Sequence, residues 1–89
     1  MAQALARNLD RKPDALRAAA AARDHAVLQR EAHAVKGIAG NVKAQAAYEL
    51  AQRVELASKE TREDAFSLAE QLAVELGRVL AAVQARLGR

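Results

Sequence analysis

The sequence predicts an all-α fold, an antiparallel up-down four-helix bundle with a short N-terminal helical extension. Alanine supplies much of the 52% hydrophobic content, and one Pro and four Gly leave few positions that interrupt a helix. Apolar residues recur at helical spacing in segments joined by short connections, so neighbouring helices must run in opposite directions to bury them. We expect the 89 residues to form one domain, with residues 1–9 as a leading segment and residues 10–87 as the bundle.

The N-terminal part of the chain is predicted to hold two separate helical elements. Two leucines four positions apart within residues 1–9 indicate a short leading helix with one apolar edge. Asp10 and Pro13 then form a helix-start signal, because Asp caps free N–H groups and Pro is tolerated in the first turn. The first helix of the bundle is therefore predicted to run from this signal to about Arg23.

Three further helices are predicted from caps and apolar stripes. Asp24 is a candidate N-cap, and a tight turn at residues 41–43 separates the second helix of the bundle from the third. Thr61, followed three residues later by Asp64, is a variant of the capping box that opens a helix. These predicted helices cover about residues 25–41, 44–57 and 65–87.

His33 is the candidate reactive residue, because it lies near the centre of an exposed helix face. At about 100° per residue, turning the apolar stripe of residues 25–41 inward puts His33 on the opposite side of that helix. Arg30 and Lys36 flank it at i−3 and i+3. Its axial neighbours on this face are Ala26, Gln29, Gly37 and Gly40.

The residue types on this face favour the transfer of a phosphoryl group. An exposed imidazole is largely neutral at neutral pH, so one nitrogen is free to attack phosphorus, and neighbouring cations offset the phosphate charge. A glycine inside a helix costs about 1 kcal/mol relative to alanine, so Gly37 and Gly40 indicate that a partner comes close to the helix surface. Gly40 also lies near the helix end, where it is a candidate for the C-terminal cap.

The residues from His33 to Ala44 resemble the signature of the histidine-containing phosphotransfer (HPt) domains. They are His-Ala-Val-Lys-Gly-Ile-Ala-Gly-Asn-Val-Lys-Ala, where the family has His-x-Leu-Lys-Gly-x-Ala-x-Asn-Leu-Gly-Ala. The resemblance covers about residues 9–87 and implies that His33 is the phosphoacceptor. It also implies that Lys36 is the cation near the phosphate and that Gly37 leaves room for a receiver domain.

The resemblance implies a phosphotransfer intermediate of a two-component phosphorelay, without a kinase activity or ATP-binding site of its own. His33 would accept phosphate from the aspartyl-phosphate of one receiver domain and pass it to the Asp of another. The receivers would belong to a hybrid sensor kinase, a response regulator or both, and they would carry Mg²⁺, so no cofactor is expected on this chain. Lys43 departs from the family because it occupies the position of the usual turn glycine. The predicted site comprises the phosphate-proximal Lys36 and Arg30 and the receiver-docking residues Gln29, Gly37, Gly40 and Lys43.

Composition and charge leave one other class of function open, a non-catalytic helical binding or scaffold bundle. A net charge of +3 permits an acidic protein or nucleic acid as the partner, although the lack of base-stacking aromatics counts against nucleic acid. No metal site is expected, because the chain has no cysteine and His25, eight residues from His33, is expected to be an ordinary surface residue. No apolar run reaches the roughly 20 residues of a spanning helix, so we expect a soluble protein without membrane insertion. The absence of cysteine fits a reducing compartment, and a cytoplasmic location is expected.

Overall fold

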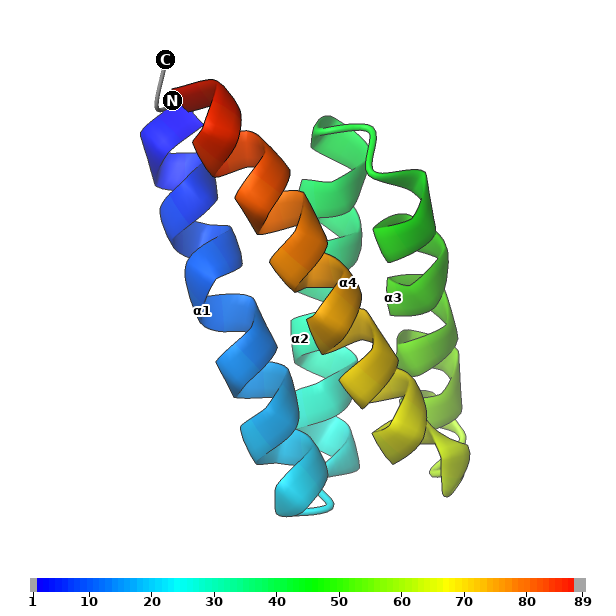
Figure 1. Ribbon diagram of the computed structural model, residues 1–89. Helices are drawn as coiled ribbons and strands as arrows, with labels where there is room; N and C mark the ends of the chain where they lie inside the picture. The colour runs from blue at the N-terminus through cyan, green and yellow to red at the C-terminus, as the bar shows by residue number, and fades with distance from the viewer. Residues whose placement is uncertain (1, 88–89) are drawn as a thin grey trace.

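The protein is a bundle of four helices, as the sequence predicts. The computed structural model describes the backbone of residues 2–87 and the side chains of residues 9–85. Each helix packs against the next one in the chain, and the last returns to pack against the first, so the antiparallel bundle is closed (Figure 1). In chain order the helices are α1 (Ala2–Ala21), α2 (His25–Asn41), α3 (Gln45–Lys59) and α4 (Asp64–Leu87).

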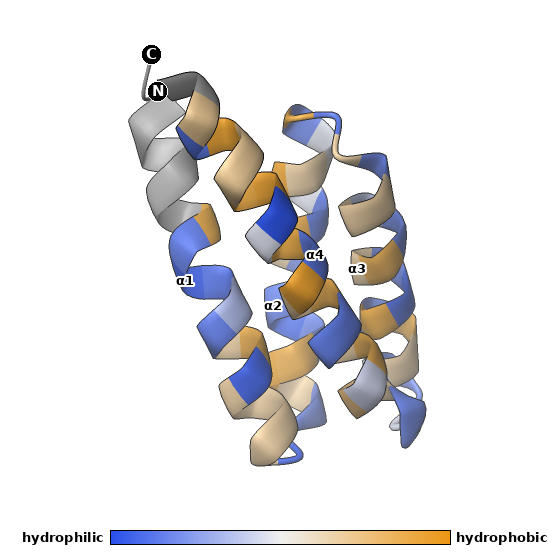
Figure 2. Ribbon diagram, viewed as in Figure 1, coloured by the Kyte–Doolittle hydropathy of each residue, from blue (hydrophilic) through white to orange (hydrophobic). Residues whose placement is uncertain are grey.

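The core lies between the four helices and consists mainly of leucine, valine and alanine side chains. Figure 2 shows hydrophobic and hydrophilic segments alternating along the helices, as expected for helices with one buried side. Full burial of one Leu or Val side chain contributes about 1.5–3 kcal/mol of transfer free energy, so these residues dominate the stability. The largest fully buried side chains are Leu9, Leu16, Leu28, Val35, Val54, Leu72 and Leu76.

The prediction of two separate N-terminal elements is wrong, because α1 is one continuous helix from Ala2 to Ala21. Asp10 therefore lies inside the helix and is not its N-cap. Pro13 also lies inside α1, where its missing N–H group removes one hydrogen bond of the helix. Leu9 and Leu16 lie two turns apart on one side of α1, and both are fully buried in the core. The burial of this stripe outweighs the lost hydrogen bond and keeps the helix continuous.

Each of the first three helices is followed, two positions after its last residue, by a residue with a left-handed backbone. Arg23, Lys43 and Thr61 have φ angles of 54°, 58° and 51°. At each turn the N–H group of this residue bonds to the carbonyl three residues back, and the next N–H group bonds five residues back, which is the Schellman motif. Glycine adopts this conformation at the least cost. Lys43 therefore has a backbone conformation that a glycine at this turn would adopt at lower cost.

The two predicted caps at helix starts have different outcomes. Asp24 is the N-cap of α2, as predicted, because its carboxylate accepts a hydrogen bond from the backbone N–H of Val27 at 3.1 Å. The prediction that Thr61 caps α4 is wrong. Its hydroxyl instead donates to the carbonyl oxygen of Glu60 at 2.7 Å, and α4 begins at Asp64.

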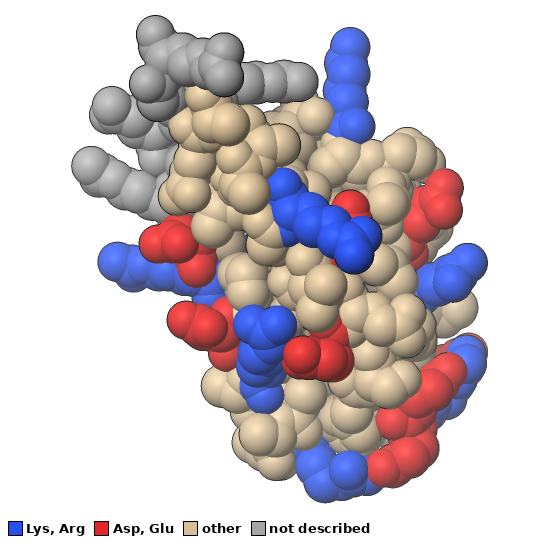
Figure 3. All heavy atoms as spheres, in the orientation of Figure 1, with Lys and Arg blue, Asp and Glu red and all other residues tan. Residues whose placement is uncertain are grey.

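The surface carries acidic and basic side chains in mixed order. Figure 3 shows them interspersed on the face that α1 and α4 form. Arg17 of α1 and Glu70 of α4 form an ion pair at 3.1 Å, and Lys12 of α1 pairs with Glu31 of α2 at 2.8 Å. None of the described helices is both long and apolar enough to cross a lipid bilayer.

Candidate functional site

His33 lies on α2, and its imidazole ring is held by a side chain of α3. The Nδ1 atom of His33 is 2.9 Å from Oε2 of Glu55, although the two residues are 22 positions apart in the sequence. They meet because α2 and α3 are antiparallel neighbours. The contact leaves the ring 70% exposed, so the imidazole is oriented by the protein and is still open to a partner.

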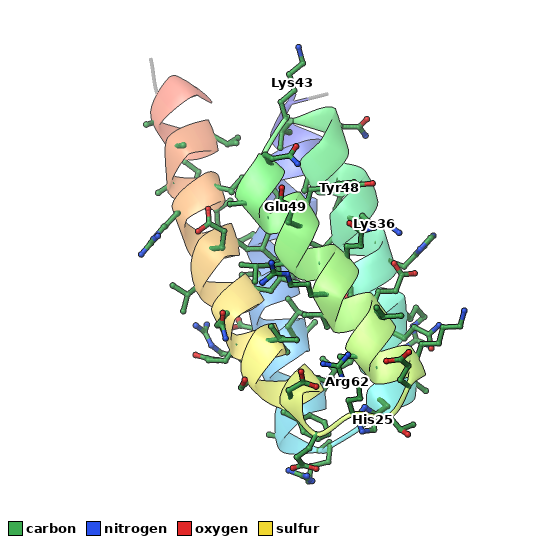
Figure 4. The ribbon with its side chains drawn as sticks, turned by 90° about the vertical axis from the view of Figure 1, so that its right-hand side faces the viewer. His25, Lys36, Lys43, Tyr48, Glu49 and Arg62 are labelled. Atoms are coloured by element: carbon green, nitrogen blue, oxygen red, sulfur yellow. The ribbon has the colours of Figure 1, made fainter. Side chains whose placement is uncertain are left out.

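Glu55 contacts a second group of the site, the ammonium of Lys36. Its Oε1 atom lies 2.8 Å from Nζ of Lys36, and both side chains are partly buried, with 21% and 26% of their surface exposed. The hydrogen bond from Lys36 lowers the pKa of the Glu55 carboxyl below its usual value, and the same bond raises the pKa of Lys36. In Figure 4 Lys36 of α2 and Tyr48 of α3 lie on the same side of the bundle. Glu55 is therefore an ionised carboxylate at neutral pH that joins α3 to two residues of α2.

The ionised carboxylate determines which nitrogen of His33 carries the proton in the neutral ring. A carboxylate can only accept hydrogen bonds, so Nδ1 of His33 must be the donor in its contact with Glu55. In the neutral ring Nε2 then keeps a free lone pair. The contact thus leaves Nε2 as the unprotonated nitrogen of the neutral ring, and the carboxylate that orients the ring also binds Lys36.

A shallow pocket of about 330 Å³ lies beside His33. Three of the predicted site residues line this pocket together, namely Gln29, Arg30 and His33. Ala26 and Glu55 complete the lining. The pocket is large enough to hold a small anionic group.

The remaining predicted docking residues lie further along α2. Gly37 is exposed, and a Cβ atom there would meet nothing within 4 Å. A Cβ at Gly40 would lie 3.8 Å from the ring of Tyr48, which is ordinary contact. Gly40, Lys43 and Tyr48 line a second pocket of about 370 Å³ with Ala39 and Gln45. The predicted docking residues therefore extend from the His33 pocket to the α2–α3 turn.

His25 differs from the expectation of an ordinary surface residue. It is the first residue of α2, and its ring packs on Phe66 with the ring centroids 4.7 Å apart. Its Nδ1 atom is buried without a hydrogen-bond partner among the described residues. The packing arises because the start of α2 lies beside the start of α4, and it leaves His25 half-buried at one end of the bundle (Figure 4).

Glu55 is the site residue that sequence reasoning missed. The sequence places it directly after the core residue Val54, in a helix with one other acidic residue, Glu49. Only the pairing of α2 with α3 shows which carboxylate faces His33. Within residues 9–85 no group of three or more His, Asp and Glu side chains is arranged to hold a metal ion.

Comparison with known proteins agrees with this fold. Residues 1–86 match the family model of the Hpt domain, so the match covers essentially the whole chain. The chain belongs to the Hpt domain family. Domains of this family are phosphotransfer carriers that hold phosphohistidine in phosphorelays and have no kinase activity of their own. No curated protein and no solved structure matches the chain.

Proposed function

We propose that this protein is the phosphoryl carrier between two receiver domains of a cytoplasmic phosphorelay. His33 accepts the phosphoryl group from an aspartyl-phosphate on one receiver and passes it to the Asp of another. The observation that carries the proposal is the exposed ring of His33, whose Nδ1 donates to Glu55 and whose Nε2 is left as the nucleophile. The receivers belong to a hybrid sensor kinase, a response regulator or both, and they supply Mg²⁺.

Two cations support the transfer in this proposal. Lys36 contacts the carboxylate of Glu55, which also contacts the imidazole of His33. Arg30 lines the pocket beside His33. A transferring phosphoryl group carries charge on its three outer oxygens, and catalysis consists largely of positioning and stabilising that charge. Lys36 and Arg30 are therefore the proposed phosphate-binding residues.

The proposed docking surface consists of Gln29, Gly37, Gly40 and Lys43. Gly37 has open space around its Cα, which supports a close approach by the receiver backbone to the helix beside His33. The second pocket, at Gly40 and Lys43, offers a further cavity on the α2–α3 side of the bundle. A receiver seated there would cover both pockets at once.

The proposal is tested by following radioactive phosphate from a phosphorylated receiver to the purified protein. Wild type should become labelled with an acid-labile, base-stable phosphate, and His33→Gln should lose the label. Because the side chain of His33 is exposed, the circular dichroism and melting temperature of His33→Gln should match wild type.

His25→Gln is the matched control for this experiment. It loses the contact with Phe66, so a lower melting temperature is expected, but it should be labelled like wild type. Labelling of His33→Gln at the wild-type level would contradict the proposal.

A further inference from the structure

The left-handed residues at the three turns of the bundle differ in what their side chains contact. The guanidinium of Arg23 pairs with Glu63 and lies over the ring of Phe66, 4.3 Å from its centroid. The hydroxyl of Thr61 donates to the preceding carbonyl oxygen at 2.7 Å. The side chain of Lys43 is exposed and forms no ion pair or hydrogen bond with any of the described residues.

A lysine at this turn weakens the fold relative to a glycine. The φ angle of Lys43 is 58°, a conformation in which a Cβ atom crowds the backbone and which glycine adopts at the least cost. At Arg23 and Thr61 contacts of the side chain offset this cost within the domain. Lys43 has no such contact among the described residues, which points to a contact of its ammonium outside the domain.

Lys43 belongs to the pocket of about 370 Å³ at the α2–α3 turn. The ring of Tyr48 lies against Gly40 in this pocket, since a Cβ atom at Gly40 would be 3.8 Å from two carbons of the ring. In Figure 4 the side chain of Lys43 extends past the end of the bundle, and Tyr48 lies further down the same side. Because lysine has a flexible four-carbon stem, the ammonium can turn towards a group seated against this ring.

The chemistry of the pocket lining suits an acidic side chain. None of the five lining residues is acidic, and the ammonium of Lys43 is the only ionised group among them. Glu49 lies outside the lining, where its carboxylate accepts from the amide of Gln45 at 2.9 Å. An incoming Asp or Glu would rest its methylene groups on the ring of Tyr48 and pair its carboxylate with the ammonium.

The pocket lies within reach of a protein that docks on His33. Gly40 follows His33 by seven residues on α2, which is two turns or about 10 Å along the helix. An interface of standard size covers about 800 Å² on each partner, a patch roughly 30 Å across. A receiver centred on His33 therefore covers this pocket with the outer part of its docking surface. Charges at the rim of an interface act mainly on the rate and selectivity of association.

We infer that Lys43 is a specificity-determining residue, which selects receivers that carry an acidic side chain at the edge of their docking surface. This side chain is seated in the pocket of Tyr48, about 10–15 Å from the phosphorus that His33 receives. The inference rests on the proposed function and extends it by naming the chemistry of the receiver surface. Lys43 acts on which receiver binds, whereas Lys36 is proposed to bind the phosphate itself.

The test compares the steady-state kinetics of transfer from a receiver that phosphorylates the wild-type protein. Lys43→Glu keeps a long side chain at the turn and reverses its charge, so the KM for the receiver should rise about tenfold while kcat stays within about twofold. Lys43→Arg keeps the cation, and its KM should stay within about twofold of wild type. The effect of Lys43→Glu should shrink between about 0.02 M and about 0.5 M salt, because exposed charges are screened.

Arg53→Glu is the matched control, because it makes the same change in net charge elsewhere on the bundle. Arg53 is exposed on α3 and forms no ion pair with a described residue. It precedes Glu55 by two positions, and at about 100° per residue it lies on the side of α3 turned away from α2. Its KM should match wild type, and circular dichroism checks that each variant remains folded.

An exchange of charges between the two proteins shows whether the contact is direct. Each Asp and Glu on the receiver surface around its phosphorylated Asp is changed to Lys in turn, and every receiver variant is combined with wild type and with Lys43→Glu. One receiver variant should transfer poorly to wild type and should recover most of the lost kcat/KM when it is combined with Lys43→Glu.

The outcomes distinguish the inference from the proposed function. The role of Lys43 is wrong, while the carrier function stands, if Lys43→Glu has the KM of wild type or if Arg53→Glu raises the KM as far. The role is also wrong if no receiver variant restores transfer to Lys43→Glu. If phosphoramidate labels His33 of the wild-type protein but no phosphorylated receiver does, the carrier function fails, and the inference fails with it.

Discussion

Replacement of Gly37 by Gln should stabilise the protein and impair its transfer reaction at the same time. Gly37 lies inside α2, has no positive φ, and a Cβ atom there would meet nothing within 4 Å. The new side chain therefore has no steric cost. Glycine in an exposed helix interior costs about 1 kcal/mol relative to alanine, and Gln is a few tenths less favourable than alanine, so a gain of about 0.7 kcal/mol is expected. For a domain of this size that gain raises the melting temperature by about 3–5 °C.

The proposed function adds a second effect at this position. Gly37 follows His33 by one turn, so a Gln side chain would obstruct a receiver that must bring its Asp to the imidazole. Transfer from a phosphorylated receiver should slow by about tenfold or more, which corresponds to a loss of about 1.4 kcal/mol in the docked complex. Labelling by phosphoramidate should remain near normal, because a small donor needs no docking surface.

Gly77 provides a matched control for both measurements. It lies inside α4 on another part of the bundle, is exposed, and a Cβ atom there would likewise meet nothing within 4 Å. Gly77→Gln should raise the melting temperature by a similar amount and leave transfer from the receiver unchanged. The reasoning is refuted if Gly37→Gln melts below wild type, or if both variants accept phosphate from the receiver at the wild-type rate.

Two other predictions concern the site and the turns. Lys36→Ala should leave the helical content unchanged and slow phosphoryl transfer by about tenfold, since one favourable charge contact contributes on the order of 1.4 kcal/mol. Equal transfer rates for the variant and wild type across ionic strength would contradict a role of Lys36 in binding the phosphate. Thr61→Gly and Lys43→Gly should each raise the free energy of unfolding in urea by about 1 kcal/mol, because glycine relieves a left-handed backbone with φ of 51° or 58°. An unchanged or lower value for Thr61→Gly, which lies outside the site, would show that its turn is not strained.

The parts of the fold that follow local rules are predictable from the sequence. The cap at Asp24 and the apolar stripe after it define α2 correctly, since the side chain of Asp24 accepts a hydrogen bond from an N–H group three residues on. The antiparallel bundle follows from four such stripes and short connections. The exposure of His33 also follows from its angle to the stripe of α2.

The features that depend on contacts between helices were not predictable in the same way. Pro13 is a helix-start signal by local rules, but the burial of Leu9 and Leu16 against the other helices keeps α1 continuous. Glu55 faces His33 only because of the register between α2 and α3, and helical periodicity within one segment contains no information about that register. Local sequence patterns therefore identify the exposed histidine but not the carboxylate that orients its ring.

The single exposed imidazole in the middle of one side of the bundle limits how the proposed carrier can meet its partners. His33 is the ninth of the 17 residues of α2, on a bundle 42 Å long and 21 Å wide. A protein interface of standard size covers about 800 Å² on each partner, which is comparable to that whole side. Donor and acceptor therefore cannot be bound together, and the reaction follows a ping-pong scheme without a ternary complex. Unphosphorylated acceptor then competes with the donor for the empty carrier, so the flux of phosphate depends on the ratio of the two receivers.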